Sequence, residues 1–229
     1  VDVLCVDSIC SFECVYCQLG KINRVTTGRD IFVSTEKILS DLKNSDWQNA
    51  DVITFSGSGE PTLAKNLGEI IEKIKELTGK PIVVLTNSTL LHLEEVRKEL
   101  LHSDKIFCKL DAWSNDTLKR FDRPEKTVSL ENIISGIKAL QCKFKGFLAI
   151  QTMILRLPNE SEIKQFAVIL QLIKPDEVQL NLPTRPIPPE YFLATRGNEV
   201  EDNQSFTHLK TISKNELEKV RDKLSKLTK

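Results

Sequence analysis

Six short apolar segments recur along the chain, and each has the usual length of a β-strand. The segments between them are longer and amphipathic; in 67–77, for example, the apolar residues keep the spacing of one helix face. The predicted strands span 1–7, 51–56, 81–86, 105–111, 147–154 and 177–182, and the predicted helices span 34–43, 67–77, 93–101, 130–140 and 160–173.

This alternation of strands and helices predicts an α/β fold with a parallel sheet and right-handed crossovers. A full eight-fold barrel needs about 250 residues, and the pattern contains six strands, so we expect a partial (βα)6 barrel. Residues 1–182 form the predicted barrel core. Residues 183–229 form a predicted C-terminal extension that packs on the core, irregular at first and ending in a charged helix over 214–226.

The charge balance is neutral, with 32 Lys plus Arg against 32 Asp plus Glu. Non-specific nucleic-acid binders carry a basic excess, so general attraction to nucleic acid is not predicted. A local group could still contact RNA: Arg24, Arg29, Lys119, Arg120 and Arg123. No apolar run reaches the ~20 residues of a membrane helix, and the first residues lack a basic signal-peptide region. A cytoplasmic location without membrane contact is the resulting expectation.

The six cysteines are unevenly spread, with four of them crowded into residues 5–17. Such crowding in a chain of this size indicates metal or redox chemistry and not a disulfide framework. Cys5 lies within the first strand pattern and is expected in the core. The isolated Cys108 and Cys142 lie in apolar patterns and are expected to be buried.

Cys10, Cys14 and Cys17 follow the first predicted strand with three and then two intervening residues. One loop can therefore present three thiolates, which are the soft ligands of iron–sulfur clusters. Three protein ligands would leave one iron of a [4Fe–4S] cluster open. The alternative is a structural zinc site, which needs a fourth ligand.

A second motif, SGSGEPT over 56–62, follows the second predicted strand. Glycine at a strand end allows close approach of the backbone to a ligand, and Glu60 supplies an acceptor there. Polar residues also end the later strands, which suggests one shared polar site at the carboxyl face of the sheet. These residues are Asn87, Lys109, Asp111, Gln151 and Asn181.

The CxxxCxxC spacing, with Tyr16 beside the last cysteine, and the SGEP sequence resemble the radical S-adenosylmethionine (SAM) superfamily. The resemblance implies a [4Fe–4S] cluster on Cys10, Cys14 and Cys17, whose open iron binds SAM. An electron then cleaves the sulfonium, and the 5′-deoxyadenosyl radical abstracts hydrogen from a substrate. It also implies a small electron donor of flavodoxin or ferredoxin type.

The same resemblance implies that the Ser58-Gly59-Glu60 segment binds the amino group of SAM, although the family has Gly where Ser58 stands. The remaining residues of the implied cofactor site are Tyr16, Asn87, Lys109, Asp111, Gln151 and Asn181. The segments CVYCQLG, TFSGSGEPTL, VLTN, KLDA and VQLN look most like the Fe–S oxidoreductase branch related to the wybutosine-synthesis (4-demethylwyosine synthase) enzymes.

The substrate is left open by the sequence and is a small molecule, a peptide or an RNA. Three alternatives remain beside the general radical SAM enzyme. They are a non-catalytic iron–sulfur or zinc module, a tRNA-modifying radical SAM enzyme, and an activating enzyme for a glycyl-radical partner.

Overall fold

A five-stranded parallel sheet forms the centre of the computed structural model, which describes residues 1–4, 7–190 and 206–228. Its strands lie in sequence order, so each is hydrogen-bonded to the next along the chain. They are β3 (Ile53–Phe55), β4 (Ile82–Thr86), β5 (Lys105–Lys109), β6 (Phe147–Met153) and β7 (Glu177–Asn181). The predicted parallel sheet is confirmed, and its open edges fit a partial barrel.

The predicted first strand over 1–7 is wrong in its described residues. Asp2 and Asp7 accept hydrogen bonds from the nearby backbone N–H groups of Leu4 (2.9 Å) and Ser8 (2.8 Å). Such local bonds offer the backbone an alternative to a sheet ladder. Cys5 lies outside the described residues.

A two-residue strand stands a little further along the chain instead. This strand, β1 (Ile9–Cys10), pairs in parallel with β2 (Arg24–Val25). Ile9 also forms a β-bridge with Gly59, just after β3. The first strand of the expected barrel is therefore reduced to a short pair beside the main sheet.

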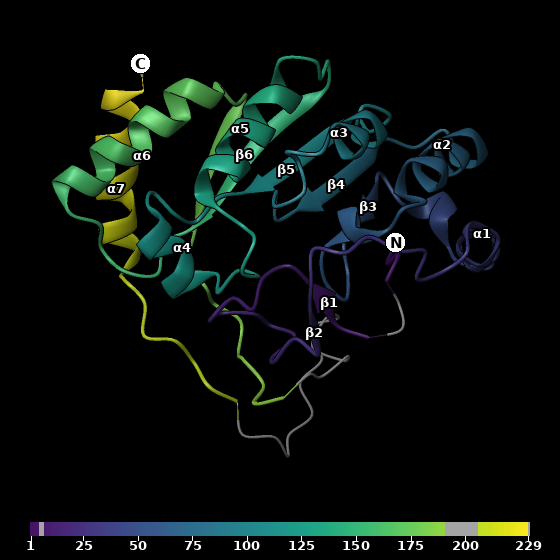
Figure 1. Cartoon of the computed structure of the whole chain (residues 1–229), viewed down its shortest axis with the longest axis horizontal. Coiled ribbons are helices and arrows are strands. Elements are labelled where there is room, and N and C mark those ends of the chain that lie inside the picture. Colours follow the sequence, from purple (N-terminus) through teal and green to yellow (C-terminus); the bar gives the residue numbers. More distant parts are fainter. Residues whose placement is uncertain (5–6, 191–205, 229) are drawn as a thin grey trace.

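The predicted helices are confirmed, with small changes at their ends. Helices α2, α3, α5 and α6 lie together on one side of the molecule, away from β1 and β2 (Figure 1). The helices between the strands are α1 (Thr35–Lys43), α2 (Leu67–Thr78), α3 (Glu94–Leu100), α5 (Leu130–Gln141) and α6 (Glu160–Ile173).

One further helix, α4 (Asn115–Phe121), was not predicted. It has seven residues, as α3 does, but only two of them, Leu118 and Phe121, are apolar, whereas the segment 93–101 around α3 has four apolar residues. Its start is set by Ser114, whose side chain accepts a hydrogen bond from the backbone N–H of Thr117. Short 3₁₀ turns over Trp47–Asn49 and Pro61–Leu63 complete the connections.

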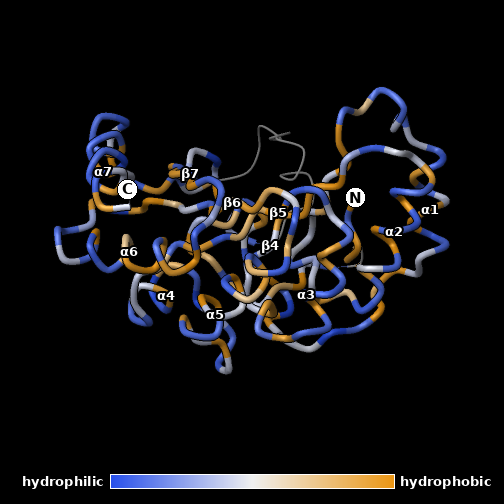
Figure 2. Tube along the Cα trace, turned by 90° about the horizontal axis from the view of Figure 1, so that it is seen from above, coloured by the Kyte–Doolittle hydropathy of each residue, from blue (hydrophilic) through white to orange (hydrophobic). Residues whose placement is uncertain are grey.

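Apolar residues concentrate on the central strands, and the helix surfaces that face outward are polar (Figure 2). Cys108, on β5, is fully buried in this core as predicted. Cys142 is exposed, contrary to prediction, because it caps the C-terminus of α5 at the surface.

The C-terminal helix α7 (Lys214–Leu227) lies beside α6 (Figure 1). Val220 and Leu224 are the residues that it buries, while its other positions are largely polar. Before it, Ile187 pairs with Thr207 in an antiparallel bridge. No helix in the described part of the chain is long and apolar enough to cross a membrane.

The start of α6 provides a test of the fold at acid pH. Glu162 accepts hydrogen bonds from Arg156 and from the backbone N–H of Asn159, and these hold its pKa at about 2. A carboxyl group whose pKa is lowered on folding stabilises the fold at pH values above its ordinary pKa. This stabilisation is lost as the pH falls toward the lowered pKa.

We therefore expect Glu162→Gln to reduce the free energy of unfolding by about 1–2 kcal/mol at neutral pH. The deficit should shrink between about pH 4.5 and about pH 2, the ordinary and folded-state values. Urea unfolding of the wild-type protein and of Glu162→Gln across this pH range measures the difference in the free energy of unfolding. A deficit independent of pH would contradict the assignment.

Candidate active site at the carboxyl ends of the strands

A cavity of about 480 Å³ opens where the carboxyl ends of the strands meet the cysteine loop. Its size falls in the range of sites for small molecules and cofactors. Most of the predicted site residues line it together. These are Cys10, Cys14, Tyr16, Cys17, Gly59, Glu60, Asn87, Lys109, Gln151 and Asn181.

The segment that follows α4 holds the cysteine loop in place. The backbone N–H of Glu13 donates to the carbonyl of Asp122 (3.0 Å), and that of Val15 donates to the carbonyl of Phe121 (2.9 Å). These bonds flank Cys14 on both sides. Helix α4, which was not predicted, therefore places Phe121 and Asp122 where they bind the cysteine loop.

The three cysteine thiols are buried or half-buried around the cavity. Burial, with Glu60 close by, raises the pKa of the Cys10 thiol to about 12, and burial also raises the pKa of Cys14 and Cys17. The thiols are neutral without a metal, so a metal must displace their protons when it binds.

The donor set fits a multi-iron cluster. Within the described residues, no group of three His, Cys, Asp or Glu side chains is arranged to hold one metal ion. In a [4Fe–4S] cluster each thiolate binds a different iron, so the thiols need only surround a common space. Cys10, Cys14 and Cys17 line the same cavity and meet that requirement.

Gly59 lines the cavity and also stands where two parts of the chain meet closely. A Cβ atom at Gly59 would lie 1.6 Å from the carbonyl oxygen of Ile9. The backbones join on both sides of this contact, from Ile9 N–H to Ser58 (3.0 Å) and from Glu60 N–H to Ile9 (3.0 Å). The glycine thus lets the turn after β3 meet the start of the cysteine loop.

Ser58 faces away from the cavity. Its hydroxyl donates to a carboxylate oxygen of Asp2 at 2.7 Å, and it is not among the residues that line the cavity. The side chain of Ser58 is thus held by Asp2, whose carboxylate also accepts from the Ser58 backbone N–H at 2.9 Å. Contact between Ser58 and the cofactor stays a prediction.

Glu60 is buried, and its carboxylate accepts four hydrogen bonds. Oε1 accepts from Thr62 N–H (3.1 Å), Thr62 Oγ1 (2.6 Å) and Thr86 Oγ1 (2.7 Å), whereas Oε2 accepts from Asn87 N–H (2.6 Å). Burial raises its pKa, and these bonds act against the shift. Oε2 keeps acceptor capacity for a cationic ligand in the cavity.

Asn87 organises the cysteine loop. Its side-chain amide donates to Ser11 Oγ (2.8 Å) and to Cys10 Sγ (3.4 Å), and its oxygen accepts from Thr89 N–H (3.1 Å) and Thr89 Oγ1 (2.8 Å). The side chain therefore reaches a predicted cluster ligand directly. The sequence suggested only a position near SAM.

Lys109 is the centre of a buried charged group beneath Cys14. Its Nζ lies 2.8 Å from Asp111 Oδ2 and also pairs with Asp122, and Tyr16 donates from its hydroxyl to Asp111. Burial alone would lower the pKa of Lys109, but Asp111 and Asp122 outweigh it and raise the pKa well above its ordinary value.

Two members of this group differ from the picture drawn from the sequence. Asp111 is buried, accepts from Met153 N–H (2.8 Å) and is not among the residues that line the cavity, so its contact with the cofactor stays a prediction. Asp122 was missed. It follows α4, whose sequence shows no clear apolar period, and nothing in its local sequence marks it.

Polar residues of β6, β7 and the segment after β7 also line the cavity. Gln151 donates from its amide to Gln179 Oε1 at 2.9 Å, next to Asn181 on β7. Arg185 contacts Gln18 across this side, which joins the segment after β7 to the end of the cysteine loop. These residues enclose the space beyond the thiols.

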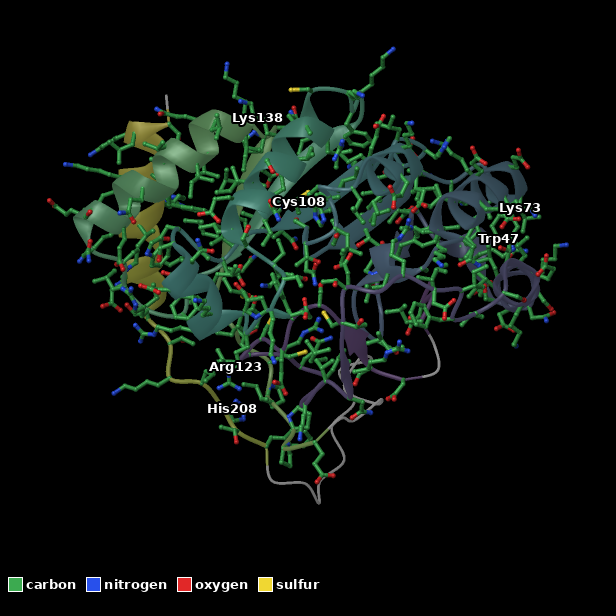
Figure 3. The ribbon with its side chains drawn as sticks, in the orientation of Figure 1. Trp47, Lys73, Cys108, Arg123, Lys138 and His208 are labelled. Carbon is green, nitrogen blue, oxygen red and sulfur yellow. The ribbon has the colours of Figure 1, made fainter. Side chains whose placement is uncertain are left out.

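The basic residues proposed for RNA contact do not act as one group. Arg29 is only 10% exposed in its side chain, because it pairs with Glu99 and donates to the carbonyl of Thr62 (2.9 Å). Its inclusion is therefore wrong. The other four are exposed, and Arg123 lies on the side of the molecule that carries β1 (Figure 3).

The family model of the radical SAM superfamily matches residues 6–170, so this chain belongs to that superfamily. It is accordingly an enzyme whose cofactors are a [4Fe–4S] cluster and SAM. A UPF0026 protein of Synechocystis is 46% identical over 228 residues, which cover 98% of this chain and 86% of that protein.

A UPF0026 protein of Methanocaldococcus jannaschii is 36% identical over 192 residues, covering 80% of this chain and 58% of that protein. This chain thus spans little more than half of that relative. Among solved structures, Streptococcus suis SuiB bound to S-adenosylmethionine aligns with a TM-score of 0.64 and 13% identity, over 96% of this chain and 45% of that chain. The likeness shows a shared fold.

The contact between Gly59 and Ile9 predicts a specific failure. Gly59→Ala should lower the free energy of unfolding by more than about 2 kcal/mol and reduce the iron taken up on reconstitution, because the two backbones must separate. Gly28→Ala is the matched control, since its nearest neighbour is a side-chain atom at 3.3 Å. Equal effects of the two substitutions would contradict this role.

Proposed function

We propose that this protein cleaves SAM reductively at a [4Fe–4S] cluster on Cys10, Cys14 and Cys17. The 5′-deoxyadenosyl radical that results abstracts a hydrogen atom from a substrate. The observation that carries the proposal is the sharing of one cavity by the three thiols and the Glu60 carboxylate. A module that only binds a metal has no use for a buried carboxylate opposite its ligands.

The single loop supports a cluster with one open iron. Its three thiolates are the protein ligands in this proposal, and the open iron faces the rest of the cavity. A closed zinc site would need a fourth ligand. Cys108 is buried in β5 and Cys142 is exposed beyond α5, and neither lines the cavity.

Glu60 is the proposed partner of the SAM amino group. An ammonium group that enters a dry cavity needs an ionised acceptor, because an unpaired buried charge is costly. The four hydrogen bonds to Glu60 favour its charged form and fix its direction. Thr62 and Thr86 thereby act as positioning residues for this acceptor.

The part of the cavity that Gln151 and Asn181 line is the proposed place for the rest of SAM and for the reacting part of a substrate. We assign Gln151 and Asn181 to this part of the site, where their amides offer both donors and acceptors. Tyr16 forms part of the wall near the cysteines, although its hydroxyl is taken by Asp111. The electron comes from a small donor of flavodoxin or ferredoxin type.

The substrate stays at the level of class: a small molecule, a peptide or an RNA. A relation to the wybutosine-synthesis enzymes would favour tRNA, and it rests on the sequence resemblance alone. The proposed working form is cytoplasmic, with residues 1–182 as the catalytic core and residues 183–229 as an extension.

Substitution of each loop cysteine tests the ligand set. Cys10→Ala, Cys14→Ala and Cys17→Ala should each lose the cluster, seen as lost iron and lost visible absorption after anaerobic reconstitution. Cys142→Ala is the matched control because this thiol is exposed and outside the cavity. Loss of iron in Cys5→Ala would instead indicate a closed four-cysteine site and would contradict the proposal.

Glu60→Gln tests the SAM site apart from the cluster. The variant should keep its iron but bind SAM at least about 10-fold more weakly, since a bond between two charged groups is replaced by a weaker one. Anaerobic calorimetric titration with SAM measures the change. The control is Glu99→Gln. Glu99 is a half-buried carboxylate that pairs with Arg29 and does not line the cavity, so the SAM affinity should stay unchanged. Unchanged affinity in Glu60→Gln would remove Glu60 from the site.

A further inference from the structure

The Lys109 ammonium is already engaged on several sides. Asp111 Oδ2 lies 2.8 Å from Nζ, Asp122 pairs with it, and the rings of Phe12 and Tyr16 lie 4.7 and 5.4 Å away. The side chain is 21% exposed, whereas the two carboxylates are 0% and 1% exposed. A ligand in the cavity would have to compete with two buried carboxylates for this cation.

Asp122 connects this cation to a cluster ligand. Its Oδ1 lies 3.6 Å from Cys14 Sγ and also contacts Lys109. Its Oδ2 is buried and has no hydrogen-bond partner in the described part of the chain. The carboxylate is thus held by Lys109 against the sulfur atom and is not satisfied by other groups.

Metal binding changes the charge at this point. Cys14 must lose its proton to bind iron, and its sulfur then faces the carboxylate of Asp122. Two adjacent negative charges in a dry site repel each other strongly. Lys109 and Arg185 are the basic residues among those that line the cavity, and Lys109 is the one that pairs with Asp122.

We propose that Lys109 and Asp122 form a charge pair that sets the reduction potential of the cluster through Cys14. The inference rests on the proposed cluster. It gives Lys109 a role toward the cluster, in place of the contact with SAM expected from the sequence. Asp122 acts as a positioning residue and as the opposing charge.

The two residues should act in opposite directions. Reduction adds one electron to the cluster, and a nearby buried cation stabilises that added negative charge. Lys109 therefore raises the potential, whereas the carboxylate of Asp122 lowers it. A purely structural role would predict that both substitutions harm the cluster in the same way.

The test is an anaerobic redox titration of the reconstituted full chain without SAM, in alkaline buffer, followed by the electron paramagnetic resonance signal of the reduced cluster. Lys109→Met should shift the midpoint potential to more negative values, and Asp122→Asn should shift it to more positive values. The double variant should return toward the wild-type potential, because both charges of the pair are removed. Lys109→Arg, which keeps the charge, is the matched control and should stay near wild type.

Unchanged potentials in both single variants, or shifts in the same direction, would overturn the inference. A loss of SAM affinity in Lys109→Met with an unchanged potential would return Lys109 to the SAM site, and would also overturn it. Circular dichroism shows whether Lys109→Met folds. If it does not, the inference is tested by the other two variants: Asp122→Asn should have a more positive midpoint potential than wild type, and Lys109→Arg should have the wild-type potential.

Failure of the proposed function is seen separately. A wild-type chain that takes up no iron–sulfur cluster would contradict the proposed function, and this inference with it. A wild-type chain that holds a cluster and releases 5′-deoxyadenosine from SAM, but whose variants show no opposite shifts, would contradict only the role of Lys109 and Asp122.

Discussion

The backbone contact between Ile9 and the turn over 58–60 is the constraint on which the site depends. It joins the start of the cysteine loop to the end of β3, although β1 itself is only two residues long. It acts together with the bonds from Asn87 to the loop and from the loop to the end of α4. A side chain at Gly59 would prevent it, so the glycine acts through the geometry of the chain.

The same contact determines where the carboxylate stands. Glu60 donates its backbone N–H to Ile9, and its side chain extends from the same residue into the cavity, where Thr86 and the backbone of Asn87 hold it. Asn87 in turn reaches Cys10. Glu60 is therefore bonded both to the residue before Cys10 and to Asn87, whose side chain reaches the Cys10 thiol. These bonds couple the proposed SAM site to the proposed cluster site.

Much of this arrangement could be predicted from the sequence, and the parts that failed have physical reasons. The strands β3 to β7 have clear apolar patterns, and polar residues end most of them, so the cavity wall was foreseen. The first strand failed because Asp2 and Asp7 bind the backbone locally. Helix α4 has only two apolar residues, Leu118 and Phe121, so no apolar period marks it, and Asp122 was missed together with it.

The direction of a side chain was also beyond the sequence. Ser58 and Gly59 are neighbours in one motif, yet the serine turns toward Asp2 and the glycine packs on Ile9. Asp111 lies two residues after the end of β5, and its side chain pairs with Lys109. Motif spacing brings residues to one place in the fold, while tertiary contacts decide which of them face the cavity.

Charge balance explains why these partners are arranged as they are. A cavity that excludes water makes every unpaired charge costly and every paired charge strong. Burial raises the pKa of Glu60 and the neutral donors around it act against that shift, so the proposed cationic ligand would supply the charge that balances its carboxylate. Lys109, with Asp111 and Asp122 around it, is already neutralised and has little to offer a free ligand. Its position under Cys14 instead makes the thiolate, and any metal bound to it, the group whose charge this part of the fold adjusts.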